Sequence, residues 1–356
     1  MILQGKRILV TGGTGSLGKV LIRRLLASEL GTPRQIIVFS RDEAKQHFMR
    51  TEYQTRAIGV SDYVYQNFHE LVTFRIGDIR DYASVTAALR DVDIVFNAAA
   101  LKQVPACEYF PYEAVLTNVV GPRNIVQAIR ELNLPVETVV GISTDKACKP
   151  VNVMGMTKAI QERLFIEANL ECPNTRFICV RYGNVLASRG SVIPLFIEQI
   201  RNGGPVTITT PDMTRFLLSL NRAVDTVFTA LTQARRGETY IPRVPSAKVV
   251  DVAAALIDHR RIEMRIVGIR PGEKTHEILV SEEEAHRTVE RDDDYYIILP
   301  ALPELHDPAE TRSRLTKEFS SAEHLLSLDE IKQLLLDHHM RVADQNGANP
   351  EQELLC

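Results

Sequence analysis

The sequence shows no large excess of charge of either sign. Its 42 lysine and arginine residues stand against 45 aspartate and glutamate residues, which gives a formal net charge of -3 at pH 7. A chain without a broad basic field is not expected to have nucleic acid or an anionic membrane as its main partner. Any anionic ligand must therefore be held by a local site.

Long apolar runs and cysteine pairs are also missing. Runs such as QIIVFS and VDIVFNAAA are far shorter than the ~20 apolar residues that span a bilayer. The opening segment MILQGKRILVTGG enters a predicted strand directly, so no export signal is expected. The cysteines are odd in number and form no C-x-x-C pair, which argues against a disulfide framework or a zinc site; they are Cys107, Cys148, Cys172, Cys179 and Cys356. These absences predict a reduced, cytoplasmic protein without a metal centre, in which Cys148 is a small hydrophobic filler.

The chain does contain an alternation of short apolar runs with helical segments. RILVT, QIIVFS, DIVFNAAA, TVVGIST and RFICVRYGNV are apolar on both faces, as expected for a parallel sheet covered on both sides. This pattern predicts an α/β protein with a Rossmann-like, doubly wound parallel sheet and a smaller C-terminal substrate-binding lobe. We expect the main domain to include residues 1–185 and about 219–260, and the lobe about 186–218 and 261–300. Residues 301–356 are expected to form a peripheral helix and a tail.

A glycine-rich turn follows the first predicted strand. In TGGTGSLG, Gly12, Gly15 and Gly18 have the spacing G-x-x-G-x-x-G and stand between a strand and a helix. Such glycines let the backbone approach a pyrophosphate, and the helix N-terminus offers free N–H groups and a positive dipole end. The turn therefore predicts a dinucleotide site, with Thr14, Ser16 and Leu17 between the glycines.

The end of the second predicted strand bears on the choice of dinucleotide. An acidic residue there would bind a ribose 2′-hydroxyl, but Ser40 and Arg41 occupy the position and Asp42 follows them. A serine hydroxyl and a guanidinium suit a 2′-phosphate, which favours NADP over NAD. Two further segments are expected to line the cofactor: GDIRD with Asp78 and Ile79 at the adenine, and NAAALKQVP with Ala98, Ala99, Ala100 and Lys102 near the nicotinamide.

These segments, together with Thr144 to Lys158, resemble the extended short-chain dehydrogenase/reductase family. STDKACKPVNVMGMTK, RYGNVLASRGSVIPLF, MTRF and GIRPGEKTHEIL closely resemble its bacterial UDP-N-acetylglucosamine 4,6-dehydratases of polysaccharide biosynthesis, over roughly residues 4–300. The resemblance implies an NADP-dependent lyase that binds UDP-N-acetylglucosamine and assembles into homo-oligomers. The chain departs from most of that family at Met154, where tyrosine is usual; a subset of the group resembles it in carrying methionine there.

A 4,6-dehydratase oxidises C4, eliminates water across C5 and C6, and returns the hydride to C6. The resemblance implies that Asp145 protonates the departing C6 hydroxyl and that Lys146 removes the C5 proton. Both roles need shifted pKa values, upward for Asp145 and downward for Lys146, which burial would supply. Met154 cannot exchange a proton, so Lys146, Asp145 or a water held by Thr144 must take the O4 proton. We favour Lys146, because a neutral amine can serve at O4 and C5 in turn.

The remaining candidate residues bind the ligands. Lys158, four residues after Met154 on the same helix face, would reach the nicotinamide ribose, and Asn118 would lie beside the cofactor. The resemblance implies that the lobe and its rim hold the nucleotide sugar, with arginines for the diphosphate. The full substrate set comprises Lys102, Asp145, Lys146, Tyr182, Asn184, Arg189, Ser191, Val192, Thr207, Thr209, Arg215, Arg270 and Glu273.

Two other functions stay open at this stage. A UDP-sugar 4-epimerase needs only the C4 oxidation, and the Thr144-Asp145-Lys146 segment speaks against it. A non-catalytic NADP-binding sensor would explain Met154, but it has no use for an acid–base pair beside the nicotinamide. The sequence does not distinguish inversion from retention at C5.

Overall fold

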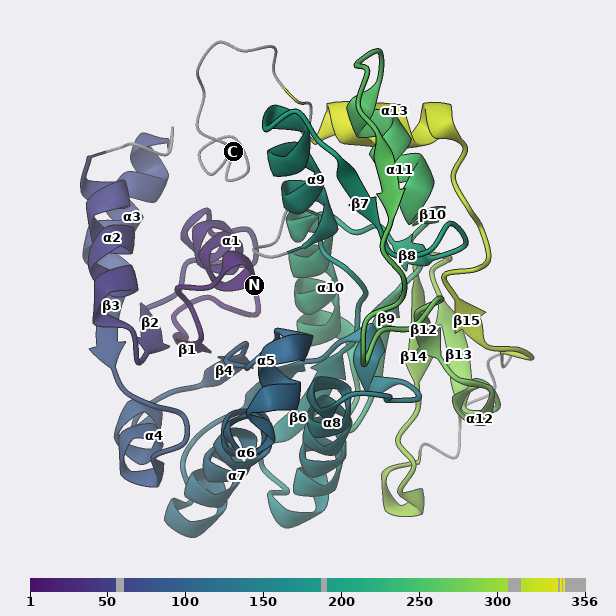
Figure 1. Cartoon of the computed structure of the whole chain (residues 1–356). Helices are drawn as coiled ribbons and strands as arrows, with labels where there is room; N and C mark the ends of the chain where they lie inside the picture. Colours follow the sequence, from purple (N-terminus) through teal and green to yellow (C-terminus); the bar gives the residue numbers. More distant parts are fainter. Residues whose placement is uncertain (56–60, 187–190, 307–314, 339, 341, 343–356) are drawn as a thin grey trace.

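The centre of the computed structural model is a nine-stranded sheet in the order β13-β14-β9-β6-β5-β4-β1-β2-β3 (Figure 1). The structure describes residues 1–55, 61–186, 191–306, 315–338, 340 and 342. The strands are β1 (Arg7–Thr11), β2 (Gln35–Ser40), β3 (Val72–Ile76), β4 (Ile94–Asn97), β5 (Thr138–Ile142), β6 (Arg176–Val180), β9 (Thr239–Pro242), β13 (Thr288–Arg291) and β14 (Tyr295–Ile298). Neighbours from β3 to β9 run parallel, and β14 and β13 extend the sheet antiparallel. The predicted Rossmann-like sheet is confirmed.

Helices cover both faces of this sheet because its strands are apolar on both sides. In β1, Ile8 and Val10 point into one core and Leu9 into the other, as the two-residue period of a strand requires. The first core lies under α1 (Ser16–Leu26), α2 (Glu43–Gln54), α3 (Asp62–Leu71) and α10 (Leu220–Gln233). The second lies under α4 (Tyr82–Leu89), α7 (Gly121–Leu132) and α8 (Val153–Glu171). Figure 1 shows α1 and α10 on one side of the sheet, with α4, α7 and α8 on the other.

Short elements connect this frame at the carboxyl ends of β4 and β5. They are α5 (Val104–Tyr109), α6 (Pro111–Val115), the π-helix η1 (Leu116–Val120) and the 3-10 turn η2 (Asp145–Ala147). A third apolar cluster, separate from the two main cores, unites Cys107, Ala114 and Met154 from α5, α6 and α8. Backbone that follows a parallel strand is where ligands bind in doubly wound folds. These connections therefore lie where a site is expected.

A smaller lobe has its own hydrophobic core. Its elements are α9 (Val192–Arg201), β7 (Val206–Ile208), β8 (Thr214–Phe216), β10 (Ser246–Lys248), α11 (Val249–Ile257), β11 (Met264–Ile266) and α13 (Leu328–Asp337). β7 pairs with β11 and β8 with β10. Figure 1 shows α9, α11 and α13 together at the upper right. The remaining elements are β12 (Ile278–Val280), α12 (Glu282–Ala285), η3 (Pro303–Leu305) and β15 (Phe319–Ser320), of which β12 and β15 pair antiparallel.

The boundaries of the lobe differ from those expected from the sequence. α11, from the segment 219–260 assigned to the main domain, packs in the core of the lobe. β13 and β14, from the segment 261–300 assigned to the lobe, form a hairpin that joins the main sheet beside β9. The helix α13, expected to be peripheral, buries Ile331 and Leu335 in the lobe core. These assignments depend on long-range pairing, which local periodicity does not report.

Candidate active site

A cavity of about 740 Å³ opens at the carboxyl ends of the parallel strands and extends to the lobe. Most predicted site residues line it: Gly12, Thr14, Gly15, Ser16, Leu17, Gly18, Ser40, Arg41, Asp78, Ile79, Ala98, Ala99, Ala100, Lys102, Thr144, Asp145, Lys146, Met154, Lys158, Tyr182, Asn184, Ser191, Arg270 and Glu273. The turns after β1, β4, β5 and β6 therefore meet in one cleft, with the loop around Arg270 across from them.

Five predicted residues do not line this cleft: Asn118, Val192, Thr207, Thr209 and Arg215. Asn118 is fully buried, and its amide accepts from Leu101 N at 2.8 Å and donates to Leu101 O at 2.9 Å. It shapes the loop after β4. Thr207 accepts from Gln199 Nε2 at 2.8 Å. Arg189, which was predicted to bind the diphosphate, lies outside the described residues.

The turn after β1 forms a tight cradle that fits a dinucleotide pyrophosphate. Gly12 has φ +66°, and a Cβ atom there would lie 2.8 Å from Ala99 N. A Cβ on Gly18 would lie 2.6 Å from Gly13 Cα, so the helix could not approach the turn with a side chain in that position. Gly15 caps α1 without a side-chain hydrogen bond, which leaves the first amides of α1 available to an anion.

Gly12→Ala should weaken both cofactor binding and folding. The left-handed backbone adds roughly 1–2 kcal/mol of strain for a non-glycine residue, and contact with the Ala99 backbone adds roughly 1–3 kcal/mol. Gly5→Ala is the matched control, because Gly5 has φ +72° with no atom within 4 Å of the added Cβ. Denaturant unfolding and cofactor titration of both variants measure the difference. Equal effects of the two substitutions would contradict a close-packed cradle at Gly12.

Two cations that follow β2, Arg41 and Lys45, line the cleft. Arg41 Nη1 lies 3.8 Å from Asp78 Oδ2, and Arg80 binds the same carboxylate at 2.6 Å. The side chain of Asp42 accepts from Lys45 N at 2.9 Å and caps α2, so this first acid after the strand is engaged locally. Lys45 also lines the cleft, although the sequence analysis did not select it. Its position one turn into the helix after Asp42 was the available signal.

Three ionisable side chains meet beyond the end of β5. Lys146 Nζ lies 3.1 Å from Asp145 Oδ1 and 3.1 Å from Glu277 Oε1. Both carboxylates are buried, and their other oxygens, Asp145 Oδ2 and Glu277 Oε2, have no hydrogen-bond partner among the described residues. Thr144 Oγ1 donates to Asp145 Oδ1 at 2.8 Å. We call Asp145, Lys146 and Glu277 the acid–base cluster.

The pKa values in the acid–base cluster agree with the sequence prediction at one residue and contradict it at another. Burial raises the pKa of Asp145, as expected. Burial alone would lower the pKa of Lys146, but Asp145 and Glu277 raise it above the ordinary value of a lysine. The predicted downward shift of the Lys146 pKa is therefore wrong, because Glu277 brings a second carboxylate to the amine from a distant segment of the chain. Burial would likewise raise the pKa of Glu277, but Lys146 and Arg215 hold it below the ordinary value.

The helix α8 carries the other two residues of the predicted catalytic set. Asn152 Oδ1 accepts from Gly155 N at 2.8 Å and begins the helix. Gly155 contacts the backbone of Lys146 so closely that a Cβ atom would not fit, which explains the glycine in VMGMTK. Lys158 Nζ donates to Ile142 O at 2.5 Å and to Gln161 Oε1 at 2.8 Å, and burial lowers the pKa of Lys158 to about 8. Met154 is buried in the cluster with Cys107 and Ala114.

Glu277 is the member of the acid–base cluster that the sequence did not predict. Its segment, KTHEIL, was noted only for its resemblance, and Glu273 was selected instead. The available signal was an acid directly before the short apolar run Ile278–Val280, the strand β12.

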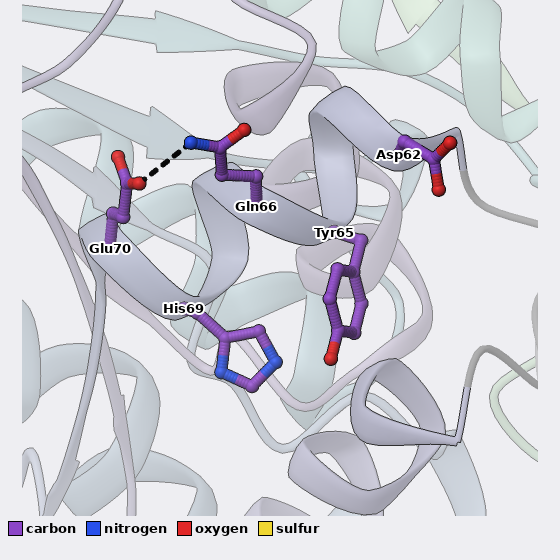
Figure 2. A pocket seen from close by; sticks show the side chains of 5 residues that line it. All are labelled: Asp62, Tyr65, Gln66, His69 and Glu70. Atoms are coloured by element: carbon purple, nitrogen blue, oxygen red, sulfur yellow. Dashed lines mark hydrogen bonds between the residues drawn. The ribbon is translucent and has the colours of Figure 1, made fainter.

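A second hollow, of about 640 Å³, lies on the outer helix α3 (Figure 2). Figure 2 shows its five lining residues, all from this one helix: Asp62, Tyr65, Gln66, His69 and Glu70. Gln66 Nε2 donates to Glu70 Oε1 at 2.9 Å. None of the predicted site residues lines this hollow, so the cleft beside the acid–base cluster is the candidate active site.

The fold and the glycine cradle define a protein of the short-chain dehydrogenase/reductase class. The family model described as polysaccharide biosynthesis protein matches residues 8–299. The chain belongs to this family, within the nucleotide-sugar epimerases and dehydratases. No helix in the described part of the chain is long and apolar enough to cross a membrane.

Relatives and solved structures agree with this assignment. A protein of Rickettsia massiliae named UDP-glucose 4-epimerase is 41% identical over 341 residues, which cover 93% of this chain and 95% of that protein. The X-ray structure of Pen from Bacillus thuringiensis matches with a TM-score of 0.84 at 34% identity, covering 96% of this chain and 100% of that one. The dTDP-glucose 4,6-dehydratase DesIV of Streptomyces venezuelae, solved with NAD and TYD bound, has a TM-score of 0.63 at 21% identity, covering 76% and 86%. At that identity the likeness shows the fold alone.

Proposed function

We propose that the protein is an NADP-dependent UDP-N-acetylglucosamine 4,6-dehydratase, a lyase that forms a UDP-4-keto-6-deoxy-N-acetylhexosamine. The observation that carries the proposal is the acid–base cluster. A half-buried amine between two buried carboxylates, at the carboxyl end of β5, supplies both an acid and a base. An elimination needs this combination.

A nicotinamide held in the cleft by the glycine cradle and Lys158 would supply the acceptor of the C4 hydride and its later donor. The chain's own residues would move the protons: Lys146 lines the cleft and exchanges protons with the sugar, while Asp145, whose pKa is raised by burial, gives a proton to the departing C6 hydroxyl. Lys158 lines the same cleft from α8 and retains donor capacity beyond its bonds to Ile142 and Gln161 for the nicotinamide ribose.

The rim of the cleft has groups suited to the nucleotide sugar. Arg270 lines it and would pair with the diphosphate. Asn184 Oδ1, Ser191 Oγ and Glu273 Oε2 are buried without a hydrogen-bond partner within the described ranges. Buried polar atoms are normally paired, so a ligand that satisfies these three would be stabilised. Tyr182 contributes a buried aromatic wall.

We also propose that the protein forms homo-oligomers and works in a reducing cytoplasm. The cysteines in the described ranges, Cys107, Cys148, Cys172 and Cys179, are all buried and unpaired. Three large aromatic side chains that are close in sequence are exposed where α5 ends and α6 begins: Tyr109 at 83%, Phe110 at 62% and Tyr112 at 70%. Such exposure supports contact with a second copy.

Binding should favour NADP(H) over NAD(H), because Ser40 and Arg41 stand at the strand end where an acid would select NAD, and Lys45 lines the cleft as a further cation. Arg41→Ala should lower NADP(H) affinity ~10-fold or more, the loss expected for a charge-assisted hydrogen bond, and leave NAD(H) affinity unchanged. Titration of apo-protein with both cofactors measures this. Arg90→Ala, at an exposed arginine outside the cleft, is the control. Equal or stronger NAD(H) binding by the unmodified protein would refute the assignment.

Met154 should act by packing alone. A thioether cannot take or give the O4 proton, so Met154→Ala should slow 4-keto sugar formation by less than the ~100-fold typical of a lost acid–base group. Met154→Tyr should not raise the rate greatly, because the proton route runs through the acid–base cluster. The rates of both variants across pH test this. Acceleration by Met154→Tyr of several orders of magnitude would show that the natural chain is defective at C4 oxidation, and would favour the sensor.

A UDP-sugar 4-epimerase is the second candidate, favoured by the name of the Rickettsia relative. Incubation with UDP-N-acetylglucosamine, followed by NMR of the product, separates the candidates. The proposal predicts a 4-keto-6-deoxy sugar. The C4 epimer would establish the epimerase, and an unchanged sugar would favour the sensor.

A further inference from the structure

Glu277 lies behind Lys146 and does not line the cleft. Its side chain is 2% exposed, and Oε1 accepts from Lys146 Nζ at 3.1 Å. Arg215 Nε lies 3.9 Å from the same oxygen, and Lys274 adds a further positive charge nearby. Oε2 is buried and has no hydrogen-bond partner in the described part of the chain. At rest, Lys146 and Arg215 hold the pKa of Glu277 below its ordinary value, so the carboxylate is ionised. Once Lys146 gives up its proton, the ammonium charge that lowers this pKa is gone, and the unpaired Oε2 can accept a proton without leaving its place.

A 4,6-elimination without an active-site tyrosine places a specific demand on this cluster. The O4 proton leaves during C4 oxidation, and the C5 proton leaves before or as the C6 hydroxyl departs. Two protons must therefore be accommodated before one is returned. Lys146 is already an ammonium, because two carboxylates raise its pKa. The Asp145 carboxylate can accept one proton, and the Met154 thioether can accept none.

We propose that Glu277 is a proton reservoir. It accepts the second proton through Lys146, which is the proton that an active-site tyrosine would otherwise hold. The inference rests on the proposed dehydratase function. Glu277 acts through Lys146 and does not itself touch the sugar.

The protons balance in four steps. Lys146 passes a proton to Asp145 and takes the O4 proton as the C4 hydride leaves, so the C4=O bond forms. Lys146 passes a second proton to Glu277 and takes the C5 proton, so the C4–C5 enolate forms. Asp145 then gives its proton to the C6 hydroxyl, the C6–O bond breaks, and water leaves with a C5=C6 bond in place. After hydride returns to C6, Lys146 protonates C5 and recovers its proton from Glu277.

Glu277→Gln tests the inference, because glutamine keeps an acceptor for Lys146 but cannot hold the proton. We expect cofactor reduction by UDP-N-acetylglucosamine to persist, with the reduced nicotinamide accumulating, while solvent deuterium incorporation at C5 and product formation fall ~100-fold or more. Glu277→Asp keeps a carboxyl and should restore a large part of the C5 exchange. Glu282→Gln, at an exposed glutamate close by in the sequence, should leave all three readouts unchanged.

Unimpaired product formation by Glu277→Gln would overturn the inference. Equal losses of C5 exchange and product in Glu277→Gln and Glu277→Asp would also overturn it, because they would show that Glu277 only maintains the geometry of the site. Infrared difference spectra upon substrate addition give a second test that does not need the glutamine variant to fold. A carboxyl group protonated during the reaction should shift in frequency in Glu277→Asp, and a spectrum with no shifted band contradicts the proposal. If the unmodified protein forms no 4-keto-6-deoxy sugar, the dehydratase function itself fails; if it does and Glu277→Gln is unimpaired, only the reservoir fails.

Discussion

Lys146→Ala should lower the rate of 4-keto sugar formation by ~10,000-fold or more, because one residue serves at O4 and at C5 and each acid–base role contributes ~100- to 10,000-fold. The amine is the only member of the acid–base cluster that lines the cleft and contacts both carboxylates. Cofactor affinity should stay near that of the unmodified protein, since the glycine cradle is unchanged. Product formation and cofactor titration are the measurements.

Two further variants separate proton exchange from charge. Lys146→Arg keeps a positive charge between the carboxylates but cannot act as a base, because a guanidinium does not lose its proton near neutral pH. It should be as inactive as Lys146→Ala. Lys149→Ala removes a lysine of the same loop whose partner is Glu318, at 3.0 Å, and should leave the rate unchanged. A Lys146→Ala variant with an unimpaired rate contradicts the mechanism.

Arg181→Met should lower the free energy of unfolding by about 3–5 kcal/mol, the loss typical when one partner of a buried ion pair is removed. Arg181 is buried and contacts two carboxylates: Nη2 lies 2.6 Å from Glu162 Oε2, and Nη1 lies 2.7 Å from Glu284 Oε2. It also donates to Leu279 O at 2.8 Å. Methionine would remove the cation that the two glutamates share and leave Glu284 with Arg287, at 3.4 Å. Denaturant unfolding measures the loss.

The control for this prediction is an arginine in an exposed pair. Arg222 Nη2 lies 2.9 Å from Asp294 Oδ1 near the surface, and Arg222→Met should change stability by only about 0–1 kcal/mol. The Arg181 network also fixes both flanks of the acid–base cluster, because Ser143 Oγ donates to Glu162 at 2.5 Å and Leu279, two residues after Glu277, lies in β12. A loss at Arg181 as small as that at Arg222 would contradict a buried, fully paired network.

The sequence predicted the parts of this protein that depend on local pattern. A side chain at Gly12 or Gly18 would collide with the neighbouring backbone of the turn after β1, so the spacing of these glycines alone indicated the cradle. The alternation of apolar strands and helices indicated the parallel sheet. Asp145 and Lys146 are adjacent in the sequence and follow β5 directly, so their meeting in the cleft required no knowledge of distant segments.

Parts that depend on distant segments could not be predicted in this way. Glu277 reaches Lys146 only because β12 packs beside η2. Without that contact, burial alone governs the expected pKa of Lys146, and the expected direction was wrong. In the same way, the hairpin of β13 and β14 belongs to the main sheet only through its pairing with β9. Local periodicity carries no information on such partners.

A 4,6-dehydratase, unlike an epimerase, returns the hydride removed from C4 to C6 after water has left. UDP-N-acetylglucosamine carrying deuterium at C4 tests this most directly, with the label located in the product by NMR. We expect deuterium in the C6 methyl group of a 4-keto-6-deoxy sugar. Deuterium found at C4 of an epimer, or retained at C4 of unchanged substrate, would contradict it.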